Sequence, residues 1–458
     1  MLDLVRRNVR FFAITLVAGI ALRVLFLIYF PSVVNDSFLY GEIAKNWLQR
    51  GVYGMTDGGG VVPTYIRLPG YPAFLAFVFA IFGLEHYRAV LTFQLFFDLG
   101  TCFLCASMAL RLLGERSAKI AFLLAALCPF FANYSGAALT ETLEVFFTAL
   151  AFDSALRGFA NRSMKYWILC GVACSGATLI RPDGAILPFV IVLYGLWRAT
   201  FAKSITTRPA QLVRMLSLVP VITVLPLVPW AIRNWHVFHH FQPLAPRYAN
   251  QEAEFVPMGF NHWVKTWIVD YVSTEEIYWG VPGSSMDLKQ LPSRAFDNQD
   301  QRAETSRLID DYNQMLHITP ALDQRFEALA RERTNAHPIR TYIVLPILRI
   351  VDMWLRPRTE MLPSDSRWWE FNDEPKWSAL AVSLGLIGLA YWLCGLVGWL
   401  RVRPLAGSGP LLLFVAVRSA FLGTLENPEP RYTLEMYPIL IVFAAAAFAG
   451  RQEDPSAQ

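Results

Sequence analysis

A series of long apolar blocks separated by short polar links constrains this chain more than any other feature. A helix needs about 20 mainly apolar residues to cross a bilayer. Only 17% of the residues are charged, whereas a soluble domain carries about 25%. Blocks of suitable length lie at 9–30, 88–110, 118–135, 138–156, 166–181, 184–200, 213–232, 377–400, 408–424 and 434–450. The sequence therefore predicts an all-α integral membrane protein with about ten transmembrane helices.

Two weaker blocks, 70–83 and 339–355, are better explained as helices on the membrane surface. The first is too short to span, and the second is amphipathic, with Arg340, Arg349 and Asp352 inside it. Without them, the basic links fall on one side, which the positive-inside rule makes cytoplasmic. These links are 111–119, 157–165, 198–214 and 401–403. Both termini are then cytoplasmic, and the first loop faces outward.

This topology predicts four segments in chain order. The first is a transmembrane catalytic module at 1–232, whose first external loop is 31–87. An extracytoplasmic loop domain at 233–376 follows, with a helical pair at 299–316 and 320–336. Thr319 is expected to cap the second helix, with Pro320 at its first position. The C-terminal transmembrane helices occupy 377–450, and a polar cytoplasmic tail occupies 451–458.

Two acids on the predicted outer side are candidates for chemistry. Asp36 directly follows the first span, where it is either the N-cap of the next helix or a carboxylate that accepts a proton or binds a cation. Glu141 begins a span, with Glu144 one turn later. An acid at a helix N-terminus is favourable in itself, so both glutamates could be there for stability alone. Of the two, Glu141 lies closer to the aqueous boundary than Glu144 and is therefore better placed for chemistry.

Several cations lie on the same side. Arg67, in YIRLPGYP, either anchors to lipid headgroups or grips a phosphate through its fork of donors. Arg181, Arg233 and Arg431 lie at helix ends and suit an anionic lipid headgroup, although Arg181 could simply pair with Asp183.

Two further charges fall inside predicted spans and are functional candidates by default. Arg23 is expected to snorkel outward, and Asp98 has no evident partner.

Together these residues resemble a known family. NDSFLYGEIAKNWLQRGVYG with RLPGYPAFLA resembles the first external loop of the GT-C membrane glycosyltransferases, within them the protein O-mannosyltransferase and lipid A aminoarabinose transferase superfamily. FANYSGAALTETLEVFF is similar to that family's second-loop acidic motif. LIRPDGAILP, PWAIRNWHVF and EPRYTLEMYPIL are also similar to family segments. The resemblance covers about 1–235 and 425–450.

The resemblance implies a GT-C-type bundle with amphipathic surface helices in the first external loop and a helical extracytoplasmic insertion. It implies inverting transfer of a sugar from a polyprenyl-phosphate donor to an acceptor hydroxyl on the non-cytoplasmic face. Asp36 would be the first-loop carboxylate, as base or metal ligand. Glu141 would be the second-loop acid, where many relatives have aspartate, and the two acids could share Mg²⁺ or Mn²⁺.

The predicted substrate contacts are Arg67, Tyr40, Tyr71, Arg181, Arg233 and Arg431. The expected partners are the lipid-linked donor, a glycan, lipid or protein acceptor, and membrane lipids, without nucleic acid. The expected location is a bacterial inner membrane, with the site facing the periplasm or exterior.

Two alternatives stay open: a transporter or flippase of a lipid-linked glycan, and a glycan ligase or polymerase on a related scaffold. Transporters often show internal repeats and helices broken at the membrane midplane. This sequence shows no internal repeat, and its candidate residues gather on one face. Both observations favour the transferase over the transporter.

Overall fold

The computed structural model describes residues 1–161, 163–201, 209–251, 254–371, 375–403 and 407–448. The chain forms two compact units. The first comprises 1–252, 389–415 and 434–458, and the second comprises 253–388 and 416–433. The predicted boundaries at 232 and 376 stay a prediction. The predicted tail 451–458 lies outside the described residues, as do parts of the links 157–165 and 198–214.

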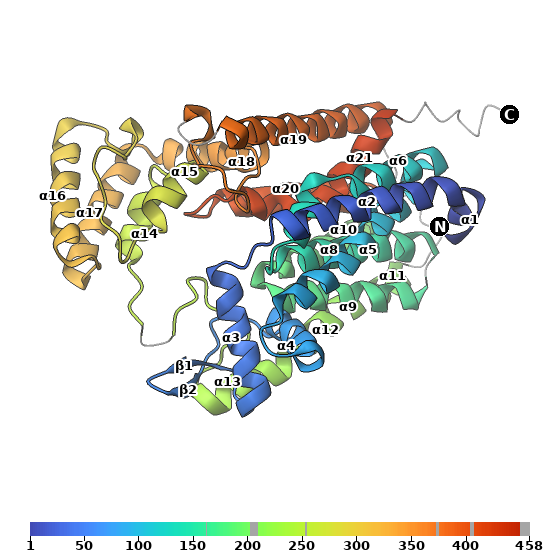
Figure 1. The fold of residues 1–458 in the computed structure, drawn as a ribbon, viewed down its shortest axis with the longest axis horizontal. Helices are drawn as coiled ribbons and strands as arrows, with labels where there is room; N and C mark the ends of the chain where they lie inside the picture. The colour runs from blue at the N-terminus through green and yellow to red at the C-terminus, as the bar shows by residue number, and fades with distance from the viewer. Residues whose placement is uncertain (162, 202–208, 252–253, 372–374, 404–406, 449–458) are drawn as a thin grey trace. The chain divides into compact units, whose positions relative to one another are not determined.

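The first unit is a helical bundle whose polar first loop contains a small hairpin (Figure 1). Its first helices and strands are α1 (Leu2–Arg7), α2 (Val9–Tyr29), α3 (Asn35–Arg50), β1 (Gly54–Asp57), β2 (Gly60–Pro63), α4 (Gly70–Phe82), α5 (Tyr87–Leu113), α6 (Glu115–Ala126) and α7 (Pro129–Ser135). Those that follow are α8 (Glu141–Asn161), α9 (Met164–Ile180), η1 (Pro182–Ala185), α10 (Ile186–Phe201), α11 (Pro209–Leu216), α12 (Leu218–Val224), α13 (Leu227–Phe238) and, near the C-terminus, α21 (Tyr437–Phe448). Helices α19 (Pro375–Val402) and α20 (Gly409–Gly423) each belong partly to both units.

The centre of the bundle is formed by α5, α8 and α9, which pack side by side, with α6 and α21 against α5 and α12 against α9. Small residues allow the close approach of α8 and α9. A Cβ at Gly158 would lie 2.6 Å from Trp167, and one at Gly176 would lie 2.6 Å from Phe147. Larger residues at either glycine would therefore push the two helices apart.

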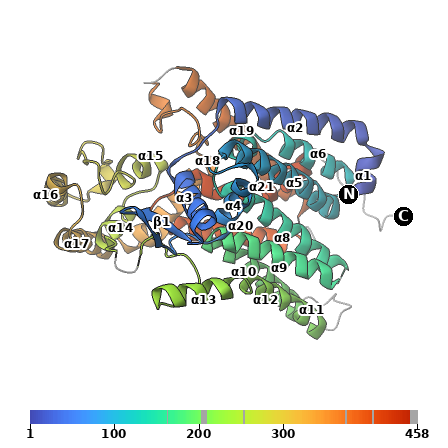
Figure 2. The same cartoon turned by 60° about the horizontal axis from the view of Figure 1, so that its bottom comes forward.

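Within the described residues, six helices are long and apolar enough to span a membrane, or seven if the bent pair α6–α7 is one span. Five of the six match predicted spans, at Val9–Tyr29, Tyr87–Leu113, Pro182–Phe201, Pro375–Val402 and Pro430–Phe448. The predicted span 213–232 falls on the consecutive helices α11, α12 and α13 (Figure 2), which together form a candidate span at Ala210–Phe238. Helices α9 and α20 are apolar but shorter. The multi-pass helical architecture is confirmed, and the number ten stays a prediction.

Arg23 and Asp98 correct one expectation about the bundle. Arg23 is completely buried, and its Nε lies 2.5 Å from the carboxylate of Asp98. The same guanidinium donates to the carbonyl oxygens of Gly19, Ala125 and Ala126. Arg23 therefore does not snorkel, because Asp98 and the α6 carbonyls supply the partners that water would otherwise provide.

The first loop folds onto one end of this bundle. Helix α3 packs against α4 and the β1–β2 hairpin (Figures 1 and 2). The predicted surface block 70–83 is helix α4. At its start, a Cβ on Gly70 would lie 2.6 Å from the backbone of Leu179 in α9. The glycine thus lets the loop backbone touch the end of α9, directly before Arg181.

The second unit is built around a helical pair. It contains α14 (Met258–Lys265), α15 (Tyr271–Ser273), η2 (Thr274–Tyr278), η3 (Ser293–Ala295), α16 (Gln299–Met315), α17 (Pro320–Ala336), η4 (Arg340–Val344), α18 (Leu345–Leu355), η5 (Trp368–Glu370) and the beginning of η6 (Pro430–Met436). The pair α16–α17 confirms the predicted segments, and the Thr319 hydroxyl accepts the Leu322 N–H, with Pro320 at the first helical position.

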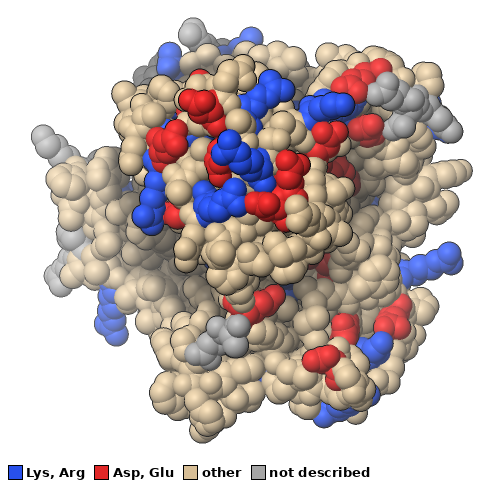
Figure 3. Space-filling model, turned by 90° about the vertical axis from the view of Figure 1, so that its left-hand side faces the viewer, with Lys and Arg blue, Asp and Glu red and all other residues tan. Residues whose placement is uncertain are grey.

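Aromatic residues of α14 and α17, among them Trp263 and Phe326, form the core of this unit. Its outer surface is charged in both signs. On the face of α16 and α17, basic and acidic side chains lie beside one another (Figure 3). Arg325 there contacts both Glu304 and Asp311. Mixed charge of this kind is typical of a solvated surface and leaves no single-sign field to steer a polyanion.

Candidate active site

Helix α3 places the first candidate acid at the surface of the loop. Asp36 lies in the first turn of α3, where a negative charge interacts favourably with the helix dipole. The N-cap position belongs to Val34, whose N–H donates to the Ser37 hydroxyl at 3.1 Å. Asp36 is therefore not the N-cap, and 38% of its side chain is exposed. The structure thus gives the N-cap position, which the sequence left open, to Val34.

Arg67 reaches this carboxylate from the far end of the loop. Its Nη2 lies 3.3 Å from Asp36 Oδ1, and its guanidinium lies 5.7 Å from the centre of the Tyr40 ring. The backbone that carries Arg67 is held by the Tyr53 hydroxyl, which donates to the carbonyls of Arg67 and Leu68 at 2.9 and 3.2 Å. A partly exposed ion pair contributes only about 0–1 kcal/mol, so its main effect is to orient the carboxylate.

Tyr40 connects this pair to the acids of α8. Burial raises the pKa of Tyr40 to about 12, opposed by Arg67 and Arg181 and supported by Asp36 and Glu144. All four charged groups therefore act on the Tyr40 hydroxyl, which stays protonated at neutral pH. Its ring packs edge-to-face on Tyr71, with centroids 5.1 Å apart. The two predicted tyrosines thus lie together beside the predicted charges.

Arg181 is surrounded by three carboxylates. Its guanidinium lies 3.3 Å from Glu144, 3.4 Å from Asp183 and 4.0 Å from Glu141. Glu141 and Glu144 are buried in the first turn of α8, while Arg181 is partly exposed. Three carboxylates against one guanidinium leave this cluster formally negative, so Arg181 is largely committed to holding acids. The sequence suggested the pairing with Asp183 but gave no sign that both glutamates would join it.

Arg233 and Arg431 have different surroundings. Arg233 donates to the carbonyls of Tyr53 and Thr64, both at 2.8 Å, and so fastens both ends of the β1–β2 hairpin to α13. In the second unit, Arg431 lies 2.6 Å from Glu429, which also accepts a hydrogen bond from Tyr432. The structure thus gives each of these arginines a partner within its own unit, and their predicted contact with a donor phosphate stays a prediction.

A preformed metal site does not assemble around the two predicted acids. Among the described residues, three or more His, Cys, Asp or Glu side chains do not converge on one point. Asp36 and Glu141 instead have arginine partners. Magnesium is often held by one or two carboxylates together with substrate phosphates. A metal here would need such additional ligands, so Mg²⁺ or Mn²⁺ stays a prediction.

Two residues that help to position the site, Tyr53 and Gln94, were not predicted from the sequence. Tyr53 holds the backbone of Arg67, and its own carbonyl accepts from Arg233. Gln94 accepts the Tyr71 hydroxyl at 2.8 Å and donates to the carbonyl of Ala137, just before Glu141. Gln94 had a signal, since an amide inside an apolar block needs a hydrogen-bonding partner. No local sequence pattern marked Tyr53, because its hydrogen-bond partners lie far from it in the sequence.

Comparisons with known proteins concern the family and the fold of this chain. Residues 63–230 match the family model of the dolichyl-phosphate-mannose-protein mannosyltransferases. The archaeal oligosaccharyltransferase AglB from Archaeoglobus fulgidus, solved with an inhibitory peptide and a dolichol-phosphate, is similar in structure with a TM-score of 0.52. The match has 14% identity and covers 96% of this chain and 50% of AglB. These matches support, for this chain, the GT-C type of fold that the sequence predicts.

The other solved structures add less to this likeness of fold. The A. fulgidus oligosaccharyltransferase with Zn and sulfate gives a TM-score of 0.51 at 13% identity, covering 95% of this chain and 48% of its own. ArnT from Cupriavidus metallidurans matches with a TM-score of only 0.42 at 15% identity, and the match covers 96% of this chain and 77% of ArnT. Among curated proteins, none matches the sequence. This chain spans about half the length of the oligosaccharyltransferase, and the likeness concerns the fold alone.

Proposed function

We propose that this protein is a glycosyltransferase that moves a hexosyl or pentosyl group from a polyprenyl-phosphate donor to an acceptor hydroxyl. The GT-C fold and the family match at 63–230 support the class of reaction. AglB was solved with a dolichol-phosphate, a lipid phosphate of the kind proposed here as the leaving group. The site would face the non-cytoplasmic side of a bacterial inner membrane, as the predicted charge topology requires.

One observation carries the assignment of the site: the Asp36 carboxylate is partly exposed and is oriented by Arg67. A base must be ionised, accessible and held in one direction. The N-cap duty that would have occupied Asp36 belongs to another residue. Tyr40, which both Asp36 and Arg181 influence, links this carboxylate to the acids of α8.

The reaction then needs a single displacement. Asp36 takes the proton of the acceptor hydroxyl, and that oxygen forms a bond to the anomeric carbon. The bond from the anomeric carbon to the phosphate oxygen breaks, and the lipid phosphate leaves with the electron pair. Attack from the side opposite the phosphate inverts the anomeric centre.

Cations that hold the phosphate would stabilise the charge that develops on it. The predicted sources are Arg181, Arg233 and Arg431. Of these, Arg233 is favoured, because it donates to carbonyl oxygens, whereas Arg181 and Arg431 already have carboxylate partners. Arg67 would keep Asp36 aligned. A divalent ion held by Asp36 and Glu141 would offset phosphate charge. No step depends on such an ion, because the two acids do not form a site by themselves.

A donor screen tests the proposal. Purified protein in nanodiscs would be incubated with defined polyprenyl-phosphate sugars and a cell-envelope extract as acceptor source, and the lipid would be followed by mass spectrometry. A transferase releases free polyprenyl phosphate and an inverted glycoside. Movement of intact donor across a vesicle bilayer without cleavage would favour the transporter instead. A requirement for lipid-linked oligosaccharide in place of a single sugar would favour the ligase.

A further inference from the structure

A cavity with a charged and aromatic lining lies entirely within the second unit, and none of its lining residues is assigned to the proposed reaction. It has a volume of about 550 Å³ and is lined by the segment 270–273, the end of α18 and the turn at 367–369. Small-molecule sites typically measure about 300–1,000 Å³. We call it the Trp369 cavity. Its size suits a ligand of one to a few rings.

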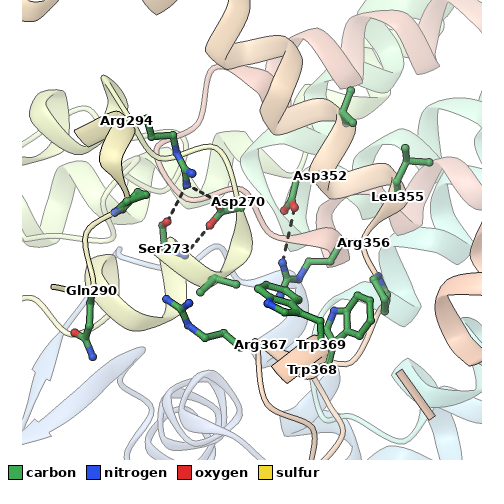
Figure 4. Close-up of a pocket in the computed structure, with 14 residues that line it drawn as sticks. Asp270, Ser273, Gln290, Arg294, Asp352, Leu355, Arg356, Arg367, Trp368 and Trp369 are labelled. Atoms are coloured by element: carbon green, nitrogen blue, oxygen red, sulfur yellow. Dashed lines mark hydrogen bonds and ion pairs between the residues drawn. The ribbon is translucent and has the colours of Figure 1, made fainter. Parts of the chain in front are cut away.

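The charges around the Trp369 cavity are compensated in pairs. Arg294 contacts Asp270 and Ser273, and Arg356 lies 3.8 Å from Asp352 (Figure 4). Arg367 makes a bidentate pair with Glu276 at 2.6 and 2.8 Å, just behind the lining. An anion such as a lipid phosphate would bind best to cations without counter-charges. Each of these three arginines already has a carboxylate, so the cavity is poorly suited to a phosphate.

The same pairs leave both donors and acceptors for a neutral, hydroxyl-rich ligand. A carboxylate has about four acceptor positions and an arginine five N–H donors. The Asp352 carboxylate accepts the Tyr271 N–H at 3.0 Å and faces Arg356. Asp270 accepts the Ser273 N–H at 2.8 Å beside its contact with Arg294. Capacity therefore remains on both carboxylates for ligand hydroxyls.

Two adjacent tryptophans supply apolar surface next to these polar groups. Trp368 and Trp369 lie nearly perpendicular, with ring centroids 5.6 Å apart, and Trp369 is 45% exposed. Figure 4 shows both indoles beside Arg356, whose guanidinium lies 5.6 Å from the Trp369 ring. The indole N–H of Trp368 has no hydrogen-bond partner among the described residues. An exposed indole beside fixed donors and acceptors matches a sugar ring, which has apolar C–H faces and a polar edge.

We propose that the Trp369 cavity binds a neutral sugar ring of the acceptor, so that the acceptor is a glycan. Only the role of this glycan as the acceptor rests on the proposed transfer reaction. The binding of a sugar here does not, because it follows from the cavity alone. Each hydroxyl of a sugar both donates and accepts hydrogen bonds. The several hydroxyls of a sugar ring therefore fit the alternating arginines and aspartates better than the single hydroxyl of a serine or threonine peptide.

Direct binding tests this. Full-length protein in nanodiscs would be applied to an array that carries neutral oligosaccharides, acidic oligosaccharides and serine- or threonine-containing peptides. Neutral oligosaccharides should bind. Trp369→Ala should weaken that binding about tenfold or more, as expected when a central aromatic contact is truncated. Trp279→Ala is the matched control, because Trp279 belongs to the same unit, is 46% exposed and does not line the cavity.

A second variant guards against misfolding. Trp369→Phe keeps an aromatic face and should retain most of the binding. Capture of acidic glycans or peptides alone, no capture at all, or equal effects of Trp369→Ala and Trp279→Ala would each overturn the proposal. The donor screen reports separately on the reaction. A protein that binds neutral glycans through Trp369 but never cleaves a donor would refute transfer and keep the sugar site, and the reverse result would refute the sugar site alone.

Discussion

Arg67 holds the carboxylate of Asp36 from a position 31 residues further along the chain, with 3.3 Å between nitrogen and oxygen. Both side chains are partly exposed, so the pair contributes little to stability. The guanidinium restricts the rotation of the Asp36 carboxylate and so fixes the direction in which this group points. This pair is the basis of the first prediction.

Asp36→Asn should abolish transfer while leaving the fold intact. The amide keeps the shape of the side chain but cannot take the proton of the acceptor, and a positioned base contributes about 10²–10⁴-fold in rate. Single-turnover transfer from the donor found in the screen would measure this. Asp57→Asn is the control, because Asp57 is an exposed acid of the same loop at the tip of the hairpin. Full activity of Asp36→Asn would exclude the base assignment.

Glu141→Gln should lower the rate about tenfold or more, the low end of what a positioned acid or base contributes. The change removes one of three carboxylates around Arg181 and leaves Glu144 and Asp183 in place. Rates would be measured with and without EDTA. If EDTA slows the wild type but not the variant, Glu141 helps to hold a metal. If neither the substitution nor EDTA has an effect, Glu141 does not belong to the site.

Ser285→Cys should react with an impermeant maleimide in intact cells. Ser285 is exposed in the predicted outward loop, whereas the native cysteines are buried or only partly exposed. Asn161→Cys, at the end of α8 in a predicted cytoplasmic link, should react only after the membrane is opened. The opposite labelling pattern would invert the topology and move the proposed site to the cytoplasmic face.

Asp352→Asn should stabilise the protein above about pH 6. Burial raises the pKa of Asp352 from 3.8 to about 6, against the effect of Arg356. The folded state thus binds this proton more tightly than the unfolded state, so stability is lost as pH rises from about 4 to about 6. Thermal unfolding of both proteins at pH 4.5 to 7.5 would show curves that diverge with rising pH. Parallel curves would show that Asp352 is not the cause.

Local signals in the sequence predicted local structure well. Thr319 and Pro320 marked the start of α17 because a capping hydroxyl and a proline act within one helical turn. The apolar blocks predicted the helices of the bundle because each must satisfy its own backbone in a membrane. The sequence left the cap of α3 open, because the N-cap is Val34, whose side chain cannot cap, and its N–H is satisfied by Ser37 within the helix.

Contacts between distant segments were the part that could not be predicted. The glutamates at the start of α8 were visible as acids, but their meeting with Arg181 depends on how α8 and α9 pack. Asp98 seemed unpartnered because its partner lies 75 residues earlier, on another helix. The first-loop motif suggested both Asp36 and Arg67, and only the fold of the loop shows that they touch.

The buried pair of Arg23 and Asp98 also has an evolutionary consequence. Removing one partner of such a pair leaves an uncompensated charge and costs about 3–5 kcal/mol, whereas replacing both by apolar residues is often neutral. Descent should therefore change these two positions together. In homologous sequences, an apolar residue at the position of Arg23 should coincide with an apolar residue at that of Asp98. Helices α2 and α5 would then be recognisable as neighbours from covariation alone.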